Sequence, residues 1–207
     1  MRILELVLLA LTALALVMFL GLVGGGATVL MLVLTLLALV YFAFGFILFS
    51  KVRLRSAFKG GFKGMPAATV VIGVVTGISL STLSIGILFK LLLMPGADEM
   101  LLVGSIESAV MIAVNIVYFL KTKSDTARLC VSRLLIFGLP AVFLLLTSPL
   151  TLVKWQYRNH PRYVEAFTKF EQDPRNPEMW DLLDLERNRI HLTPEEFALY
   201  EKSMRRE

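Results

Sequence analysis

The stretch ILFKLLLMPGADEMLLVGSIESAVM, residues 87–111, contains two apolar segments joined by a short polar turn at Pro95 and Gly96. Roughly 20 consecutive apolar residues in an α-helix cross a hydrocarbon layer about 30 Å thick. The stretch therefore predicts a hairpin of two membrane-spanning helices. Lys90 lies near the end of the first helix and Glu107 lies inside the second, where lipid makes a charge costly.

The composition indicates that most of the chain is as apolar as this hairpin. Of the 207 residues, 57% are hydrophobic and 18% are charged, and the mean hydropathy is +0.74. Soluble domains have about a quarter of their residues charged. The acidic residues are concentrated after residue 153. We therefore predict a transmembrane domain over residues 1–153 and a polar helical tail over residues 154–207.

Five apolar segments are long enough to cross a membrane. They are residues 3–23, 27–49, 67–93, 100–120 and 134–153. The predicted fold is an all-α polytopic membrane bundle with a short helical C-terminal tail. Pro140 and Pro149 interrupt the fifth segment. The segment could therefore be either a kinked span or a re-entrant segment.

Basic residues between the segments predict the orientation of the bundle. The two basic loops, 51–64 and 121–133, carry Lys51, Arg53, Arg55, Lys59, Lys63, Lys121, Lys123, Arg128 and Arg133. Cytoplasmic loops are enriched in such residues. We therefore expect a multi-pass membrane protein with a cytoplasmic N-terminus. The tail would be periplasmic if the fifth segment spans and cytoplasmic if that segment is re-entrant.

A shift of the chain by 70 residues places residues 19–33 on residues 89–103 without gaps. A Gly-Ala turn aligns in the two copies, and a basic residue follows each copy, at Lys51 and Lys121. The two copies would have the same orientation in the membrane, as in a parallel repeat. We therefore predict that the hairpin is duplicated.

Only the second copy carries charges within the hairpin. At a shift of 70, Leu20 occupies the position of Lys90, and Leu37 occupies that of Glu107. The axial gap between the two charged side chains would be about 6 Å, and helical side chains lean toward the N-terminus in a direction that closes this gap. We therefore predict that Lys90 and Glu107 form an ion-coupling pair.

Each charge also has a simpler explanation. Lys90 can extend its ammonium to the headgroups, and Glu107 can be a neutral carboxyl that hydrogen-bonds a neighbouring helix. Intramembrane ionisable residues nevertheless often mark ion pathways. Burial favours the neutral acid, and a nearby ammonium favours the carboxylate. The competition between these two effects would let such a carboxyl bind and release protons.

The hairpin over about residues 67–120 resembles the transmembrane hairpin of the GldL/PorL family. The matching residues are Leu88-Phe89-Lys90, Pro95-Gly96-Ala97, Met100-Leu101, Gly104 and Glu107. That family forms the proton-motive-force-driven membrane motor of gliding motility and type 9 secretion. The resemblance implies roles in energisation for Lys90 and Glu107, with Pro95 and Gly96 forming the turn.

Two functions follow as expectations. In the first, the protein is a proton-motive-force-responsive subunit of a membrane motor or secretion complex and uses Lys90 and Glu107. In the alternative, it is a non-catalytic structural subunit whose charged pair fixes helix packing and whose tail docks a partner. Both imply contact with membrane lipid and a homo-oligomer or a complex with other transmembrane subunits. Neither function implies a nucleic-acid partner.

The sequence predicts neither an enzyme nor a bound cofactor. It has no glycine-rich phosphate loop and no nucleophile paired with a base. Cys130 is the only cysteine, and the two histidines, His160 and His191, have no clustered ligands around them in the sequence. We therefore expect no metal site.

The tail contains signals for three short helices. Pro161, Pro177 and Pro194 each suit the first position of a helix. Thr193 and Glu196 have the spacing of a capping box. We expect a small helical subdomain, with an interfacial anchor or a partner-docking surface as the alternative.

Overall fold

The computed structural model describes residues 2–49 and 66–204, and all regular secondary structure in these residues is helical. The predicted all-α class is confirmed. The chain divides into two compact units, Met1–Thr147 and Ser148–Glu207. The division lies a few residues before the boundary expected from composition, because Ser148 and Pro149 begin a new helix inside the predicted fifth segment.

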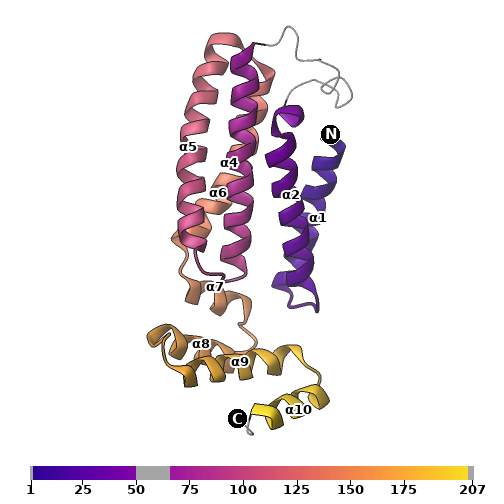
Figure 1. Ribbon diagram of the computed structural model, residues 1–207, viewed down its shortest axis with the longest axis vertical. Coiled ribbons are helices and arrows are strands. Elements are labelled where there is room, and N and C mark those ends of the chain that lie inside the picture. The colour runs from indigo at the N-terminus through magenta and orange to yellow at the C-terminus, as the bar shows by residue number, and fades with distance from the viewer. Residues whose placement is uncertain (1, 50–65, 205–207) are drawn as a thin grey trace. The chain divides into compact units, whose positions relative to one another are not determined.

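In its described residues, 2–49 and 66–147, the first unit has five long helices (Figure 1). They are α1 (Arg2–Leu20), α2 (Gly26–Phe49), α4 (Ala67–Leu91), α5 (Ala97–Thr122) and α6 (Asp125–Leu146). Each is long and apolar enough to cross a membrane. The expectation of five such segments is confirmed. The basic loop 51–64 lies outside the described residues.

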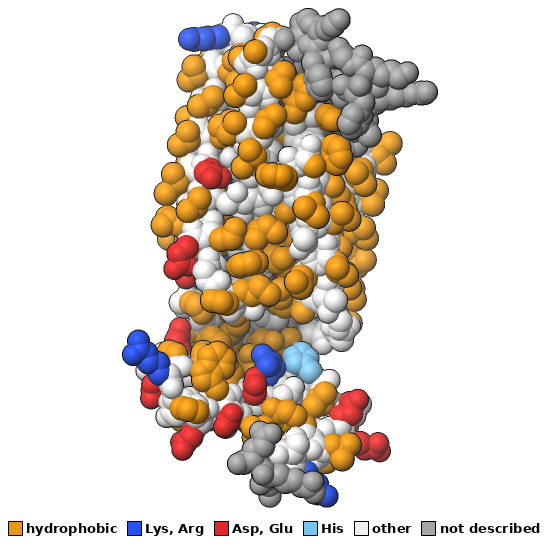
Figure 2. All heavy atoms as spheres, viewed as in Figure 1, with side chains coloured by type: hydrophobic (Ala, Val, Ile, Leu, Met, Phe, Trp, Pro, Cys, Tyr) orange, Lys and Arg blue, Asp and Glu red, His pale blue; other side chains and the backbone are white. Residues whose placement is uncertain are grey.

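The helices of this unit are apolar on their outer faces as well as inside. About half of the spans of α2 and α4 is buried, whereas 22% of the α1 span and 28% of the α5 and α6 spans are buried. Hydrophobic side chains cover most of the visible face of the bundle, and charged side chains are concentrated on the tail (Figure 2). Helices that are hydrophobic all round suit a lipid environment.

Helices α2 and α4 approach each other closely at a pair of glycines. A Cβ added at Gly77 would lie 2.5 Å from the carbonyl oxygen of Tyr41, and one at Gly45 would lie 2.6 Å from the Cα of Gly77. Small residues let membrane helices pack backbone against backbone. These two glycines therefore allow α4 to take a central position, where it also packs on α5 and α6.

Helices α4 and α5 pack through two reciprocal glycine contacts. A Cβ at Gly86 would lie 3.1 Å from Leu101, and a Cβ at Gly104 would lie 3.1 Å from Leu83. Both leucines are fully buried. Gly86 and Gly104 therefore allow the backbones of α4 and α5 to pack closely together.

The turns that close α1–α2 and α4–α5 have the same geometry with a shift of 71 residues. Leu22 and Leu93 have φ of 53° and 55°, and Gly25 and Gly96 both have φ of 78°. Each turn contains an i→i−5 backbone bond, 3.0 Å long at Val23 and 2.8 Å long in the second turn. Both turns lie at the same end of the bundle (Figure 1).

The structural register corrects the alignment made from sequence at a shift of 70. The 71-residue shift places Phe19, not Leu20, at the position of Lys90, and Leu36, not Leu37, at that of Glu107. The sequence alignment followed the Gly-Ala pairs, whereas the backbone matches glycines with positive φ. Neither Lys90 nor Glu107 has a charged counterpart in the first hairpin.

The predicted fifth segment is divided between two helices. Helix α6 begins at Asp125, continues through Pro140 and ends at Leu146. Pro149 is at the start of α7 (Pro149–Gln156), where Ser148 accepts a hydrogen bond from the amide of Thr151. The predicted loop 121–133 is therefore mostly helical, and only a two-residue connection separates α5 from α6.

The second unit contains α7 and the three predicted tail helices. They are α8 (Pro161–Gln172), α9 (Pro177–His191) and α10 (Pro194–Met204), each starting at an expected proline. The capping box is formed, since Thr193 N donates to Glu196 Oε2 at 3.0 Å and Glu196 N donates to Thr193 Oγ1 at 3.4 Å. The hydrogen bonds to Thr193 hold the pKa of Glu196 below its usual value.

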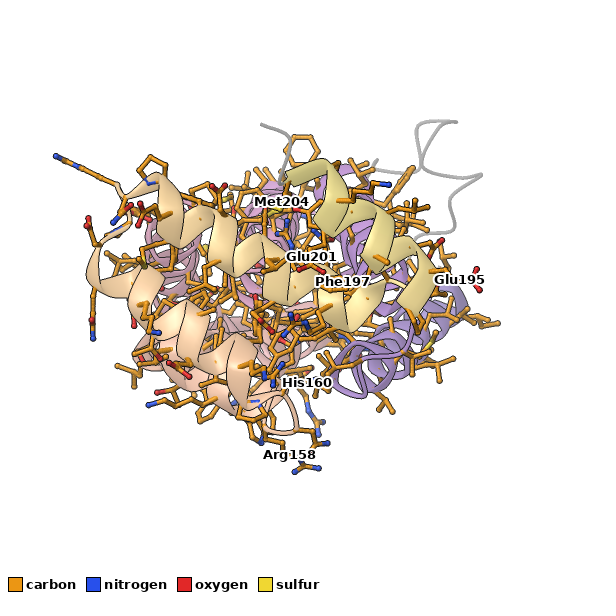
Figure 3. All side chains as sticks on the ribbon, turned by 90° about the horizontal axis from the view of Figure 1, so that it is seen from below. Arg158, His160, Glu195, Phe197, Glu201 and Met204 are labelled. Carbon is orange, nitrogen blue, oxygen red and sulfur yellow. The ribbon has the colours of Figure 1, made fainter. Side chains whose placement is uncertain are left out.

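Aromatic side chains hold the tail helices together. The ring centroids of Tyr157 and Tyr163 are 4.3 Å apart, and those of Phe170 and Trp180 are 4.4 Å apart. Burial raises the pKa of Tyr163 to about 12. Phe197 and Met204 lie along α10 (Figure 3), and Arg189 stacks over the Phe197 ring at 5.2 Å. The predicted small helical subdomain is therefore packed on itself.

Candidate functional site: the charged groups of the membrane unit

The ammonium of Lys90 is held at the end of the second hairpin. Lys90 lies in the last turn of α4 and its side chain is 3% exposed. Its Nζ donates to Oδ1 of Asp98 at 2.5 Å. Asp98 lies in the first turn of α5, and its side chain is 56% exposed. Each charge has the sign that its helix end favours.

The predicted pairing of Lys90 with Glu107 is therefore replaced by a pairing with Asp98. Asp98 lies directly after the turn, at the level that a lysine in the last turn of α4 can reach. Glu107 lies about 13 Å further along α5, at 1.5 Å per residue. Asp98 was not predicted as the partner of Lys90.

Glu107 lies half-buried in the middle of α5. Its Oε2 is buried and has no hydrogen-bond partner among the residues that the structure describes. Ser105 and Ser108 lie in the same turn of the helix. Their hydroxyls are also buried and have no hydrogen-bond partner among the described residues. This turn of α5 therefore contains three buried polar oxygens within an otherwise apolar span.

Further polar contacts follow the α4–α5 interface away from the turn. Asn115 Nδ2 donates to Thr76 Oγ1 at 3.3 Å and to the carbonyl of Met111 at 2.7 Å. The hydroxyls of Thr69 and Tyr118 are 2.7 Å apart. Polar residues of the second hairpin therefore lie at several levels of the same helix pair.

A second charged cluster joins the first, second and last helices of the bundle. Arg133 Nε donates to Glu5 Oε1 at 2.6 Å, and its Nη2 donates to Oε2 at 3.3 Å. Tyr41 Oη donates to Oε1 at 3.0 Å. Glu5 and Tyr41 are buried, at 2% and 0% exposure. Both carboxylate oxygens are therefore satisfied by donors.

This cluster was not predicted from the sequence, which places Arg133 in a basic loop. A signal was present, because an acid in the first turns of an apolar helix needs a partner in lipid. Arg133 directly precedes the predicted fifth segment, and its place in the predicted basic loop put it outside the membrane helix.

The described part of the chain has no group of side chains that could hold a metal ion. No cluster of three or more His, Cys, Asp or Glu side chains occurs within residues 2–49 and 66–204.

His191 lies near enough to His160 and Arg187 to be affected by their charges. Partial burial, followed by these two charges, lowers its pKa below the ordinary value of 6.5.

Comparisons with protein-family models, with curated proteins and with solved structures give no match. The class therefore follows from the fold and the charged groups. Five long apolar helices, consistent with a multi-pass membrane protein, are followed by a compact helical tail unit.

Proposed function

We propose that the protein is a GldL-like subunit of an energised complex in the bacterial inner membrane, and that Glu107 is its proton-responsive group. The observation that carries the proposal is the buried Oε2 of Glu107, which has no partner among the described residues and lies in the middle of a candidate membrane span. The chain would act with other transmembrane subunits or with copies of itself.

The pairing of Lys90 with Asp98 supports this assignment. An ammonium paired with another carboxylate is not available to Glu107 as a counter-ion. A charge without a counter-ion is costly at membrane depth, so a carboxyl there exchanges its proton only when water or a cation reaches it. That is the behaviour required of a coupling group.

The neighbouring serines support a role in proton exchange. Ser105 and Ser108, in the same turn of α5, have two more buried oxygens without partners among the described residues. Hydroxyl groups both donate and accept hydrogen bonds, so they can bind a water at this depth of the span. In this proposal Lys90 keeps the hairpin closed through Asp98, and Glu107 performs the proton exchange.

The proposal is tested on the full chain reconstituted in liposomes. Cys130 is replaced by serine, and a fluorophore is attached through Ser124→Cys in the α5–α6 connection. An imposed proton gradient should change the fluorescence, and Glu107→Gln should abolish the change. Glu99→Gln, which removes an exposed acid in the first turn of the same helix, is the control. A response that persists in Glu107→Gln would refute the proposal.

The alternative function is a structural subunit, and the Lys90–Asp98 ion pair favours it specifically. A buried ammonium bound to the first turn of the next helix fixes the closure of the hairpin. If the protein serves only assembly, Asp98→Asn should weaken complexes of the chain, as measured by native mass spectrometry. Glu107→Gln should then leave both the complexes and the fluorescence unchanged.

A further inference from the structure

We infer that the groove between α4 and α5 near Lys121 binds one anionic phospholipid. The groove has a volume of about 410 Å³. It is lined by Ile72 of α4 and by Ala113, Val114, Val117, Tyr118 and Lys121 of α5. This inference does not involve Glu107 and is independent of the proposed function.

The order of the lining residues matches the order of groups in a phospholipid. Val114 and Val117 are exposed apolar side chains within the candidate span. Lys121 lies in the last turn of the helix, about 10 Å further along its axis from Val114. Tyr118 lies between them, as tyrosine does where hydrocarbon meets headgroups. An acyl chain would lie on the valines and a phosphate would reach the ammonium.

The phenol of Tyr118 is fixed in position by α4. Its hydroxyl is 2.7 Å from that of Thr69, which is buried. This bond joins the two walls of the groove at the end nearest Lys121. The groove is therefore a defined feature of the α4–α5 pair rather than a gap between independent side chains.

Charge favours an anionic headgroup over a zwitterionic one. Lys121 is exposed and forms no ion pair with any residue that the structure describes. Lys123, in the connection that follows, is also exposed, and its ammonium lies 5.5 Å from the Phe119 ring centroid. Basic pockets between membrane helices bind anionic headgroups, and each lysine near the membrane surface contributes about 1 kcal/mol.

The test is native mass spectrometry of the full chain, released from nanodiscs that contain equal amounts of phosphatidylglycerol and phosphatidylcholine. We expect one retained phosphatidylglycerol per chain. Lys121→Gln should reduce its retention about fivefold. Ala113→Phe, which fills the apolar part of the groove, should abolish retention. Lys202→Gln, which removes an exposed lysine of the tail, is the charge-matched control and should have no effect.

Three results would overturn the inference. The first is that no phosphatidylglycerol is retained, or that its retention is unaffected by Lys121→Gln and Ala113→Phe. The second is equal retention of phosphatidylcholine, which would make the groove a nonselective apolar surface. The third is a dimer that Ala113→Phe dissociates while lipid retention stays constant, because the occupant would then be a second copy. Unchanged thermal unfolding of Lys121→Gln confirms that a loss of lipid is not a loss of fold.

Discussion

Arg133 and Glu5 are 128 residues apart in the chain, and the Nε of Arg133 lies 2.6 Å from the Oε1 of Glu5. The carboxylate is buried and also accepts a bond from Tyr41. The contact therefore links α1, α2 and α6, three helices that pack elsewhere through apolar side chains. A buried charge that loses its partner is strongly destabilising, whereas an apolar replacement of both partners is often nearly neutral.

This contact predicts the outcome of a double-mutant cycle. Arg133→Met should destabilise the bundle by about 3–5 kcal/mol, because it leaves the Glu5 carboxylate buried without its cation. The double variant Glu5→Leu/Arg133→Met should recover most of the loss. Denaturant unfolding in detergent, followed by far-ultraviolet circular dichroism, measures both. Equal destabilisation by the single and double variants would show that the two side chains are not coupled.

The close approach of α2 and α4 predicts a strong effect of one added methyl group. Gly77→Ala should destabilise the bundle by roughly 1–3 kcal/mol, because the new Cβ overlaps backbone atoms of α2. Gly138→Ala in α6 is the matched control, since a Cβ there meets nothing within 4 Å. The control should be neutral or slightly stabilising, because alanine is the better helix former. Thermal unfolding in detergent distinguishes the two, and similar values would contradict the described packing.

The ion pair at the second turn predicts different effects for adjacent acids. Asp98→Asn should destabilise the hairpin by roughly 1–3 kcal/mol, because it removes the charged acceptor of a buried ammonium. Glu99→Gln should have little effect, since Glu99 is exposed. Hydrogen–deuterium exchange of the segment 88–100 is the measurement. Equal exchange in the two variants would indicate that Lys90 does not depend on Asp98.

The tail unit should lose stability in mildly acidic solution. The folded state lowers the pKa of His191 below 6.5, so the unfolded chain binds more protons as the pH falls through that value. Stability is therefore complete above pH 6.5, decreases just below it and levels off below the folded pKa. His191→Gln should flatten this dependence. Fluorescence of Trp155 and Trp180, both in the tail unit, follows its unfolding. A wild-type profile with the opposite slope would contradict the assignment.

Much of the fold was predictable because the dominant signals are local. The length of an apolar run determines a candidate membrane helix, and prolines at first-turn positions mark the starts of α8, α9 and α10. The start of α6 was not predictable from hydropathy. The residues 125–133 are polar enough to resemble a loop, and Arg133 becomes compatible with a membrane helix only through its bond to Glu5.

The candidate site was predictable in part. The sequence drew attention to Lys90 and Glu107 as charges in apolar segments, and the structure places both in the second hairpin. Their partners depend on three-dimensional position. The choice of Asp98 for Lys90 follows from the turn at Leu93 and Gly96, whose backbone geometry also shifts the repeat by one residue. Hydropathy does not determine such a shift, because apolar segments match easily at several shifts.

The most direct test of a protonatable Glu107 is labelling of the intact chain in lipid with a hydrophobic carbodiimide, followed by peptide mass spectrometry. The reagent adds to protonated carboxyls and leaves a covalent adduct. Glu107 should be modified, faster as the pH falls, and the adduct should vanish in Glu107→Gln. Glu5, held as a carboxylate by Arg133, should remain unmodified and serves as the internal control. Labelling of Glu5 but not of Glu107 would contradict the account.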